Sequence, residues 1–402
     1  MYRIALVTDS PYVHSGYGVS AKQFIDCYIH DESRNYELVV LSFGDSGSVH
    51  QRDGVLYIPN PRIHFGDLFF NETLPKLQEC YALDAIVTLK DPYVFAPNML
   101  AQLKYWFPFV PIDTEPISPI LTERLAHCAR PIAFSHDGLR QLRASGFVPL
   151  YAPLGFWRAD YYRIEQHEAR KMLGLPEDSF IAVFVGANQS VPSRKSIPEI
   201  LLAWREFVRR YPSALLYMHT HLVHPHGLDV LRLIDDLGIG EHVRCTDRDE
   251  YALGFSAEKM RALYNAANVV VNPSTGGGFE RVILEAQACG TPVIATHFTA
   301  MRDMVWAGVS LYVNEVPQSQ KELDKNLQAY RLRPRPVDIL NALQYIAELD
   351  EAQRERLRES AMRGASAYEF STLYDKYWKT TFNMIVDTIA QKRTYVRGIA
   401  MV

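Results

Sequence analysis

Short runs of β-branched residues alternate with longer amphipathic stretches along almost the whole chain. This alternation is typical of β-α-β units, in which the strands pair into a mainly parallel sheet. In the N-terminal half, the expected strands are 4–8, 37–43, 84–89, 109–112 and 131–135; in the C-terminal half they are 181–186, 215–219, 243–246, 269–272, 293–296 and 310–313. Segment 149–155, which contains proline and glycine, separates the two series and suits a linker. At 402 residues the chain is longer than one core usually supports, so we predict an α/β fold with two Rossmann-like domains.

The end of the chain departs from this alternation and favours one long helix. Its residues Tyr374, Tyr377, Trp378, Thr381, Phe382, Ile385 and Ile389 recur at helical spacing and form one broad, mostly apolar face. We expect this helix to leave the second domain and pack back on the first; the alternative is docking on its own domain or at a dimer contact. The predicted organisation is therefore 1–152, 153–365 and a terminal helix in 366–402.

Charge and cysteine content narrow the classes of protein. A formal net charge of -4 argues against a large electrostatic footprint for nucleic acid and leaves room only for a local basic groove. No Cys-x-x-Cys pair occurs among Cys27, Cys80, Cys128, Cys245 and Cys289, so we expect free thiols in a reducing compartment. With no signal-peptide pattern and no run of about 20 apolar residues, the expected location is the cytoplasm, with contact at a membrane surface left open.

The segment from Val269 to Thr296 is the strongest candidate for a ligand site. An apolar strand is followed by a loop with three glycines, Gly276 to Gly278, then by an expected helix from Phe279 to Cys289. Glycines let a ligand approach the backbone, and the free N–H groups at a helix start favour anionic oxygen such as phosphate. Glu285 in this helix is placed to accept hydrogen bonds from ribose hydroxyls. The alternative is an i,i+4 ion pair with Arg281 on a solvated face.

Residues 278–296 resemble the donor-site signature of retaining glycosyltransferases of family four, which have the GT-B fold of two facing Rossmann-like domains. In that family, two glutamates separated by seven residues flank a Gly-Phe-Gly turn; the second binds the nucleotide ribose and the first contacts the donor sugar. The second glutamate corresponds to Glu285, whereas the first corresponds to Gly277. The resemblance therefore places Gly277, Gly278 and Phe279 in the donor site. It makes Glu280 a substitute carboxylate, or else a helix-start charge without a ligand.

Two cations follow the first strand of the second domain. In the family, an Arg and a Lys here hold the diphosphate; Lys195 matches the Lys, while the usual Arg position is Ala187 and Arg194 is the substitute candidate. Cations at this place would stabilise the negative charge that develops on a leaving diphosphate. The alternative is two solvated residues at a helix start.

The first domain supplies a second glycine loop and a carboxylate. Gly16 and Gly18 fit a Gly-x-Gly-x-x-Ala pattern that begins well after the preceding strand ends, which makes it a weak dinucleotide signal. The resemblance implies that this loop approaches the donor phosphate and the acceptor; the alternative is an ordinary loop. Asp113 follows a strand where many family members have a His, so we expect it to contact the donor sugar or the acceptor hydroxyl rather than only cap a turn.

Four histidines and one Asp-x-Asp sequence resemble metal-binding motifs. The histidines are His219, His221, His224 and His226. They lack a nearby Cys or acidic ligand, and Asp247-Arg248-Asp249 lies in the wrong domain for a metal motif, so we predict no metal. We instead expect His219 to end a strand near the donor cleft and Tyr251 to lie in a loop beside the nucleotide base.

The resemblance implies a glycosyltransferase that moves a sugar from a UDP- or GDP-sugar to an acceptor hydroxyl, with retention and without metal or other cofactor. The candidate catalytic residues are Asp113, Glu280 and Lys195. A nucleotide-sugar epimerase of the same fold and a non-catalytic nucleotide-sugar-binding protein are the alternatives. The acceptor class stays undefined, with nucleic acid disfavoured by the charge.

Overall fold

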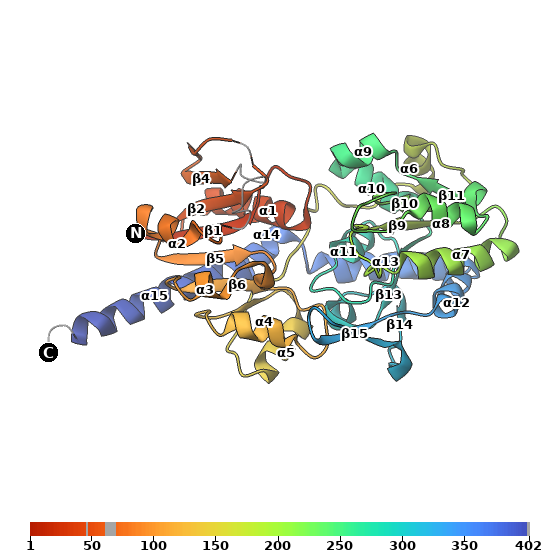
Figure 1. Cartoon of the computed structure of the whole chain (residues 1–402). Helices are drawn as coiled ribbons and strands as arrows, with labels where there is room; N and C mark the ends of the chain where they lie inside the picture. The colour runs from red at the N-terminus through yellow and green to blue at the C-terminus, as the bar shows by residue number, and fades with distance from the viewer. Residues whose placement is uncertain (46, 61–69, 400–402) are drawn as a thin grey trace.

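The computed structural model describes residues 1–45, 47–60 and 70–399, and it has two α/β domains side by side (Figure 1). Each domain contains its own parallel sheet with helices against it. The predicted fold of two facing Rossmann-like domains is confirmed.

The first domain is built on an eight-stranded sheet in the order β3-β4-β2-β1-β5-β6-β7-β8. Its strands are β1 (Tyr2–Asp9), β2 (Tyr36–Phe43), β3 (His50–Arg52), β4 (Val55–Asn60), β5 (Ala85–Leu89), β6 (Trp106–Val110), β7 (Ile132–Ala133) and β8 (Leu150–Tyr151). All neighbours pair in parallel except β3 with β4. The prediction missed β3 and β4, and it wrongly assigned β8 to a linker, because two residues next to a proline carry no recognisable strand pattern.

The helices of the first domain are α1 (Gly16–His30), α2 (Leu74–Cys80), α3 (Pro97–Leu100), α4 (Pro119–Leu125) and α5 (His136–Ala144), with a 3-10 turn η1 (Pro92–Val94). Helix α1 begins at the predicted glycine loop. The Ser15 hydroxyl caps it by accepting a hydrogen bond from the Gly18 N–H at 3.0 Å.

The second domain is built on a six-stranded parallel sheet in the order β11-β10-β9-β12-β13-β14. Its strands are β9 (Ile181–Val185), β10 (Leu215–His219), β11 (Val243–Cys245), β12 (Val269–Asn272), β13 (Val293–Thr296) and β14 (Gly308–Leu311). The helices are α6 (Gln166–Leu173), α7 (Ile197–Arg210), α8 (Val230–Asp236), α9 (Arg248–Leu253), α10 (Ala257–Ala266) and α11 (Arg281–Ala288), with 3-10 turns η2 (Gly240–His242), η3 (Thr299–Asp303) and η4 (Gln318–Gln320). A hairpin of β15 (Lys321–Asp324) and β16 (Ala329–Leu332) follows. The predicted bounds of β9, β10, β12 and β13 match within one residue because these strands are mostly apolar runs buried on both faces.

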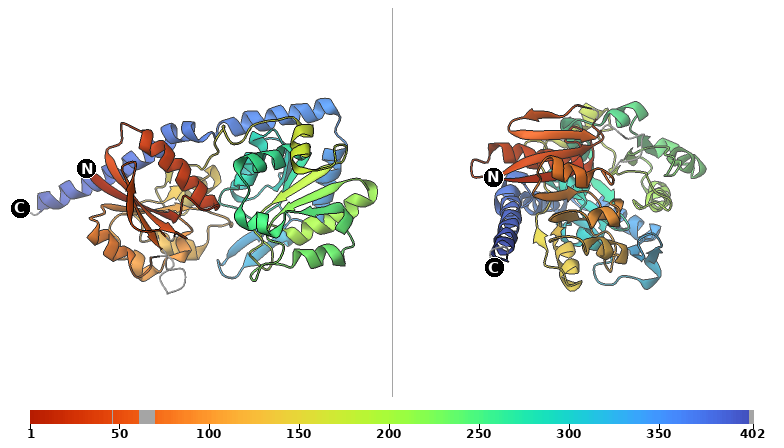
Figure 2. Two further views of the ribbon diagram at one scale, coloured as in Figure 1. Left: turned by 90° about the horizontal axis from the view of Figure 1, so that it is seen from above. Right: turned by 60° about the vertical axis from the view of Figure 1, so that its left-hand side comes forward.

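The chain then runs back along both domains, as the left view of Figure 2 shows, through α12 (Pro336–Ala347), α13 (Glu351–Ser366), α14 (Phe370–Leu373), the π-helical turn η5 (Tyr374–Trp378) and α15 (Lys379–Ile399). Fully buried Trp378 packs against Phe24 of α1 with ring centroids 5.1 Å apart, and its Nε1 donates to the Pro153 carbonyl at 2.8 Å. Phe382 and Ile385 are buried in the same core. The terminal helix thus returns to the first domain, as predicted. Within the described part of the chain, no helix combines the length and the apolar character needed to cross a membrane.

Each sheet has one point where the strand order reverses, between β1 and β5 and between β9 and β12. In open parallel sheets, ligands bind beyond the carboxyl ends of the strands at such a point. Gly16 begins helix α1 after β1, the loop after β5 contains Asp91, and the loops after β9 and β12 contain Lys195 and Gly277. All four residues line one cavity between the domains.

Candidate active site

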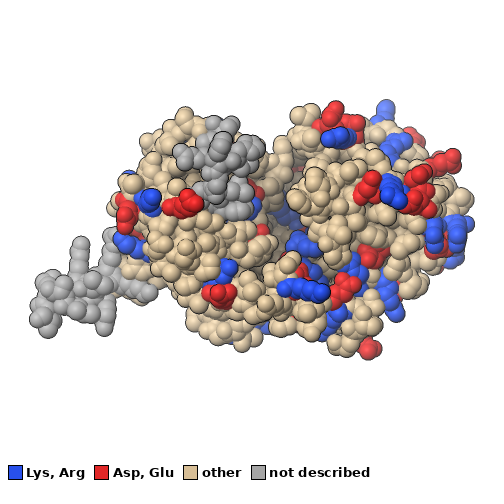
Figure 3. All heavy atoms as spheres, in the orientation of Figure 1, with Lys and Arg blue, Asp and Glu red and all other residues tan. Residues whose placement is uncertain are grey.

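The cavity between the domains has a volume of about 600 Å³. Its wall in the first domain includes Gly16, Tyr17, Asp91, Tyr93, Pro111 and Asp113, and its wall in the second domain includes Gly186, Ala187, Ser190, Arg194, Lys195, Gly277, Gly278, Phe279, Glu280 and Arg281. In the space-filling view, Lys and Arg side chains are visible in the hollow between the domains (Figure 3). The structure therefore brings together eight of the twelve residues that the sequence placed at the site: Gly16, Asp113, Arg194, Lys195, Gly277, Gly278, Phe279 and Glu280.

Lys195 and Glu280 form a buried ion pair at the centre of the second-domain wall. Lys195 Nζ lies 2.7 Å from Glu280 Oε1 and 2.8 Å from Oε2. Asn272 at the end of β12 donates a further hydrogen bond to Glu280 Oε2 at 3.3 Å. The sequence left two alternatives open: a solvated Lys195, and a Glu280 that has no partner at the helix start. Neither alternative describes this arrangement. Both side chains are instead held on the cavity wall by one another.

Gly277 explains why Glu280 can lie there. A Cβ atom at Gly277 would come within 2.4 Å of Glu280 Oε1, so the Glu280 carboxyl occupies the space beside residue 277. A side chain at position 277 and the observed Glu280 conformation exclude one another. The family resemblance predicts a glutamate at position 277. The carboxyl group of Glu280, the residue immediately before α11, occupies the space beside that position instead.

The other two glycines of this loop face protein. A Cβ at Gly276 would lie 2.0 Å from the Asp113 carbonyl oxygen, and one at Gly278 would lie 2.4 Å from Pro111 Cβ. The expectation that these glycines let a phosphate approach the backbone stays a prediction, and Gly278 lines the cavity. In this structure Gly276 and Gly278 admit the backbone that follows β6, and so they allow the two domains to meet.

Asp113 ties the two walls together. Its carboxylate accepts from Arg194 Nη1 at 2.7 Å and from Arg331 Nη2 at 3.0 Å, while Arg331 Nη1 donates to its carbonyl at 3.1 Å. Both arginines belong to segments after β9, whereas Asp113 follows β6. Asp113 is neither a turn residue nor a helix cap, and its carboxylate is already occupied by two cations.

Sequence reasoning missed Asp91 and Tyr17, which also line the cavity. The Tyr17 hydroxyl donates to the Asp91 carboxylate, and burial, followed by the charge of Asp113, raises the pKa of Asp91. The signal that could have found Asp91 is its position just after a buried strand at the switch point of the sheet. The sequence around Asp91, Lys-Asp-Pro, contains no motif that would mark it as a site residue.

Glu285 does not line the cavity. It is buried behind Arg281, whose Nη2 lies 3.0 Å from Glu285 Oε1, and it accepts from the Tyr264 hydroxyl at 2.9 Å. Burial raises the pKa of Glu285, and the attraction of Arg281 offsets only part of this shift. The i,i+4 ion pair between Arg281 and Glu285, which the sequence offered as an alternative, is present, but it is buried rather than solvated. Of the two residues, only Arg281 lines the cavity.

Gly18, His219 and Tyr251 also lie off the cavity wall. Gly18 is needed for packing, because a Cβ there would come within 2.6 Å of the Ser10 carbonyl oxygen. His219 ends β10 as predicted, and burial lowers its pKa to about 4. Tyr251 lies in helix α9, not in the expected loop, with its ring 4.9 Å from that of His219.

Of the two sequences that resemble metal motifs, the Asp-x-Asp sequence supplies a helix cap and the histidines lie near one another. Asp247 caps α9, where its Oδ1 accepts from the Asp249 N–H at 2.9 Å, and the rings of His221 and His224 are 5.3 Å apart. Among residues 1–45, 47–60 and 70–399, no group of three or more His, Cys, Asp or Glu side chains is arranged to hold a metal ion.

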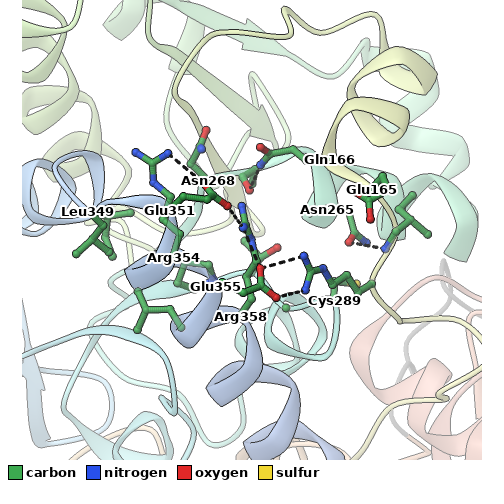
Figure 4. Close-up of a pocket in the computed structure, with 18 of the residues that line it drawn as sticks. Glu165, Gln166, Asn265, Asn268, Cys289, Leu349, Glu351, Arg354, Glu355 and Arg358 are labelled. Atoms are coloured by element: carbon green, nitrogen blue, oxygen red, sulfur yellow. Dashed lines mark hydrogen bonds and ion pairs between the residues drawn. The ribbon is translucent and has the colours of Figure 1, made fainter.

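A smaller pocket of about 290 Å³ lies in the second domain between α6, α10 and α13 (Figure 4). The ion pair between Arg163 and Glu355, 2.5 Å apart, closes one side, and Cys289 and Gly290 lie at another. None of the predicted site residues lines this pocket. The predicted chemistry is therefore concentrated in the cavity between the domains.

Comparison with known proteins agrees with this architecture. A family model described as glycosyl transferases group 1 matches residues 180–328. D-inositol 3-phosphate glycosyltransferase 1 of Catenulispora acidiphila is 32% identical over 150 residues, which are 36% of this chain and 34% of that protein. D-inositol 3-phosphate glycosyltransferase of Geodermatophilus obscurus is 28% identical over 294 residues, which are 71% of this chain and 59% of that protein. The chain thus spans 34% and 59% of the length of these two relatives.

Solved structures extend the likeness to the whole chain. Sucrose-phosphate synthase from Thermosynechococcus elongatus superposes with a TM-score of 0.69 at 18% identity and covers 100% of both chains. HepE of Anabaena, in complex with UDP-glucose, gives a TM-score of 0.65 at 17% identity and covers 95% of this chain and 100% of its own. At such identities the likeness shows the fold. The chain thus has the GT-B fold, and its residues 180–328 match the glycosyl transferases group 1 family.

Proposed function

We propose that this protein transfers a hexose from a nucleotide-diphosphate sugar, such as a UDP- or GDP-sugar, to an acceptor hydroxyl, with retention of configuration. The observation that carries the proposal is the cavity at both switch points, where Lys195, Arg194 and Glu280 face Gly16 and Asp113. The family match supports the same activity, and D-inositol 3-phosphate glycosyltransferases are among the relatives.

In this proposal, the diphosphate takes the place of Glu280 beside Lys195. Lys195 Nζ is 2.7 Å from Glu280 and its side chain is mostly buried, so an incoming phosphate would meet a cation that is already positioned. Glu280, released from Lys195, would accept hydrogen bonds from hydroxyls of the donor sugar. Its location beside Gly277 supports this role, because that is where the family has its sugar-contacting glutamate.

The reaction we propose needs no protein nucleophile, no metal and no other cofactor. The bond between the anomeric carbon and the phosphate oxygen breaks, and the acceptor oxygen forms its bond on the same face. The acceptor proton passes to the departing phosphate oxygen. Lys195 and Arg194 stabilise the charge that develops on the leaving diphosphate, and closure of the domains excludes the water that would otherwise hydrolyse the donor.

Nucleotide binding and donor turnover test this proposal separately. Calorimetry with UDP, GDP, UDP-glucose and GDP-mannose should identify a preferred base, and release of that nucleotide from its sugar should be slow without acceptor and faster with it. Tight binding with no turnover for any acceptor would indicate a non-catalytic nucleotide-sugar-binding protein. Absence of binding to every nucleotide would reject the site.

A further inference from the structure

A second cavity of about 830 Å³ adjoins the first one on the side of the β15–β16 hairpin. Tyr93, Ser190 and Arg194 line both cavities. A molecule in the second cavity would therefore meet the contents of the first one at these three residues. We call the second cavity the hairpin cavity.

The hairpin belongs to the second domain in sequence but contacts the first domain. The Glu115 N–H donates to the Tyr330 carbonyl at 3.0 Å, and the Ser118 hydroxyl donates to the Leu327 carbonyl at 2.5 Å. Ile120 of α4 forms the first-domain side of the hairpin cavity. Both domains thus enclose the hairpin cavity, as both enclose the first one.

Several apolar side chains of the hairpin cavity are open to solvent, beside the exposed polar residues Glu322, Lys325 and Asn326. Leu323 is 53% exposed, Val191 66% and Tyr93 42%, and Ile120 and Pro192 lie beside them. Large apolar side chains that gather exposed around a hollow mark a binding site more often than scattered ones do. This surface suits an apolar group of a ligand.

The arginines of the same wall carry no unmatched charge. Arg331 pairs with Asp113 and Asp324, at 3.0 and 2.8 Å. Arg333 pairs with Glu199 at 3.0 Å and with Glu322 at 2.7 Å. Arg194 also pairs with Asp113, and Lys325 is an exposed fourth cation of the wall, so four cations meet the four carboxylates of Asp113, Glu199, Glu322 and Asp324. A phosphate or carboxylate group on the ligand would have to compete with these carboxylates. The balance favours a neutral ligand.

We propose that the hairpin cavity binds the acceptor, and that this acceptor is neutral and carries its hydroxyl group on a molecule with an apolar portion. The apolar portion lies against Leu323, Val191 and Tyr93, and the hydroxyl reaches the donor at the junction of the two cavities. This inference rests on the proposed glycosyl transfer and adds the acceptor's site and class.

Phenyl β-glucoside and methyl β-glucoside are suitable probes, because they differ only in the apolar group. Calorimetry in the presence of UDP should show that the phenyl compound binds about tenfold more tightly, as expected for burying one apolar group. The same preference should appear in kcat/KM for UDP release from UDP-glucose. Glucose 6-phosphate should bind more weakly than the phenyl compound.

Leu323→Ser should remove the preference for the phenyl group while leaving the affinity for UDP unchanged. Leu231→Ser on α8 is the matched control, since Leu231 is 50% exposed and lies away from both cavities; it should keep the preference. Equal affinity for the two glucosides, a preference for glucose 6-phosphate, or an unaltered Leu323→Ser variant would overturn the inference. Selective binding of the phenyl compound without turnover of either UDP-glucose or GDP-mannose would instead contradict the proposed function and leave the hairpin cavity as a binding site.

Discussion

The two walls of the central cavity are held in place by different means. On the second-domain wall, Lys195 pairs with Glu280 and the Thr299 hydroxyl accepts from the Gly277 N–H at 3.0 Å, so the contacts lie within one domain. On the first-domain wall, Asp113 is held by Arg194 and Arg331, which both come from the other half of the chain. The contacts of the second-domain wall do not cross the domain boundary, whereas those of the Asp113 carboxylate do. We therefore expect donor binding to depend on the second-domain wall and transfer to depend on both.

The largest effect should come from removing the cation of the second-domain wall. Lys195→Ala should lower the rate of transfer by about 10³-fold, because Arg194, the other cation that faces the leaving diphosphate, is already paired with Asp113. Rates of nucleotide release at saturating donor measure this loss. Lys259→Ala is a control at a half-exposed lysine paired with Glu250 away from the cavity. A Lys195→Ala enzyme of normal rate would show that the buried pair is only structural.

Weakening the ion pairs that join the two walls should lower the rate of transfer by a smaller factor. Asp113→Asn keeps the shape of the side chain but weakens its bonds to Arg194 and Arg331, and misplacement of the reacting groups by about 1 Å costs roughly 10²-fold in rate. We expect kcat/KM for transfer to fall by this amount, with the affinity for the free nucleotide nearly unchanged. A parallel loss of nucleotide affinity would mean that Asp113 belongs to the donor site itself.

A pH-dependent difference between the domains should follow from His219. Burial lowers the pKa of His219 to about 4, so the unfolded chain takes up a proton near its usual pKa while the folded second domain does not. Stability of the second domain should therefore be lost as the pH falls from about 7 to about 5, by about 2 kcal/mol. Urea unfolding at the two pH values measures this loss, and His219→Gln should reduce it. An equal pH dependence in both proteins would assign the effect to other groups.

The smallest effect concerns Glu285, which supports the second-domain wall from behind. Glu285→Gln should weaken nucleotide binding by about tenfold, since a charged hydrogen bond to Arg281 or to a ribose hydroxyl is lost. Comparing UDP with 2′,3′-dideoxy-UDP separates these two explanations. If both nucleotides lose the same factor in the variant, Glu285 acts through Arg281.

The sequence predicts the second domain better than the first, for a physical reason. Strands β9, β10, β12 and β13 are buried on both faces and appear as uninterrupted apolar runs, so their ends could be predicted within one residue. Strands β3 and β8 have only three and two residues and owe their conformation to neighbours distant in sequence. Local pattern alone does not identify such strands.

The residues of the candidate site likewise fall into those that the local sequence predicts and those that depend on contacts between distant segments. Lys195 and Glu280 could be predicted because they lie in recognisable motifs beside a strand or a helix start. The pairing between Asp113 and Arg331 could not, since it joins residues 218 positions apart across the domain boundary. Asp91 and Tyr17 were missed because their importance comes from the meeting of two loops at the sheet's switch point.

The return of the terminal helix has a consequence for synthesis of the protein. The core of the first domain includes Phe24 and Phe109, yet it is completed by Trp378, Phe382 and Ile385. When a ribosome has released the first domain's strands, the residues that cover them are still to be translated. The first domain to emerge is therefore the last to be finished, and until then its aromatic surface would need protection from association with other chains.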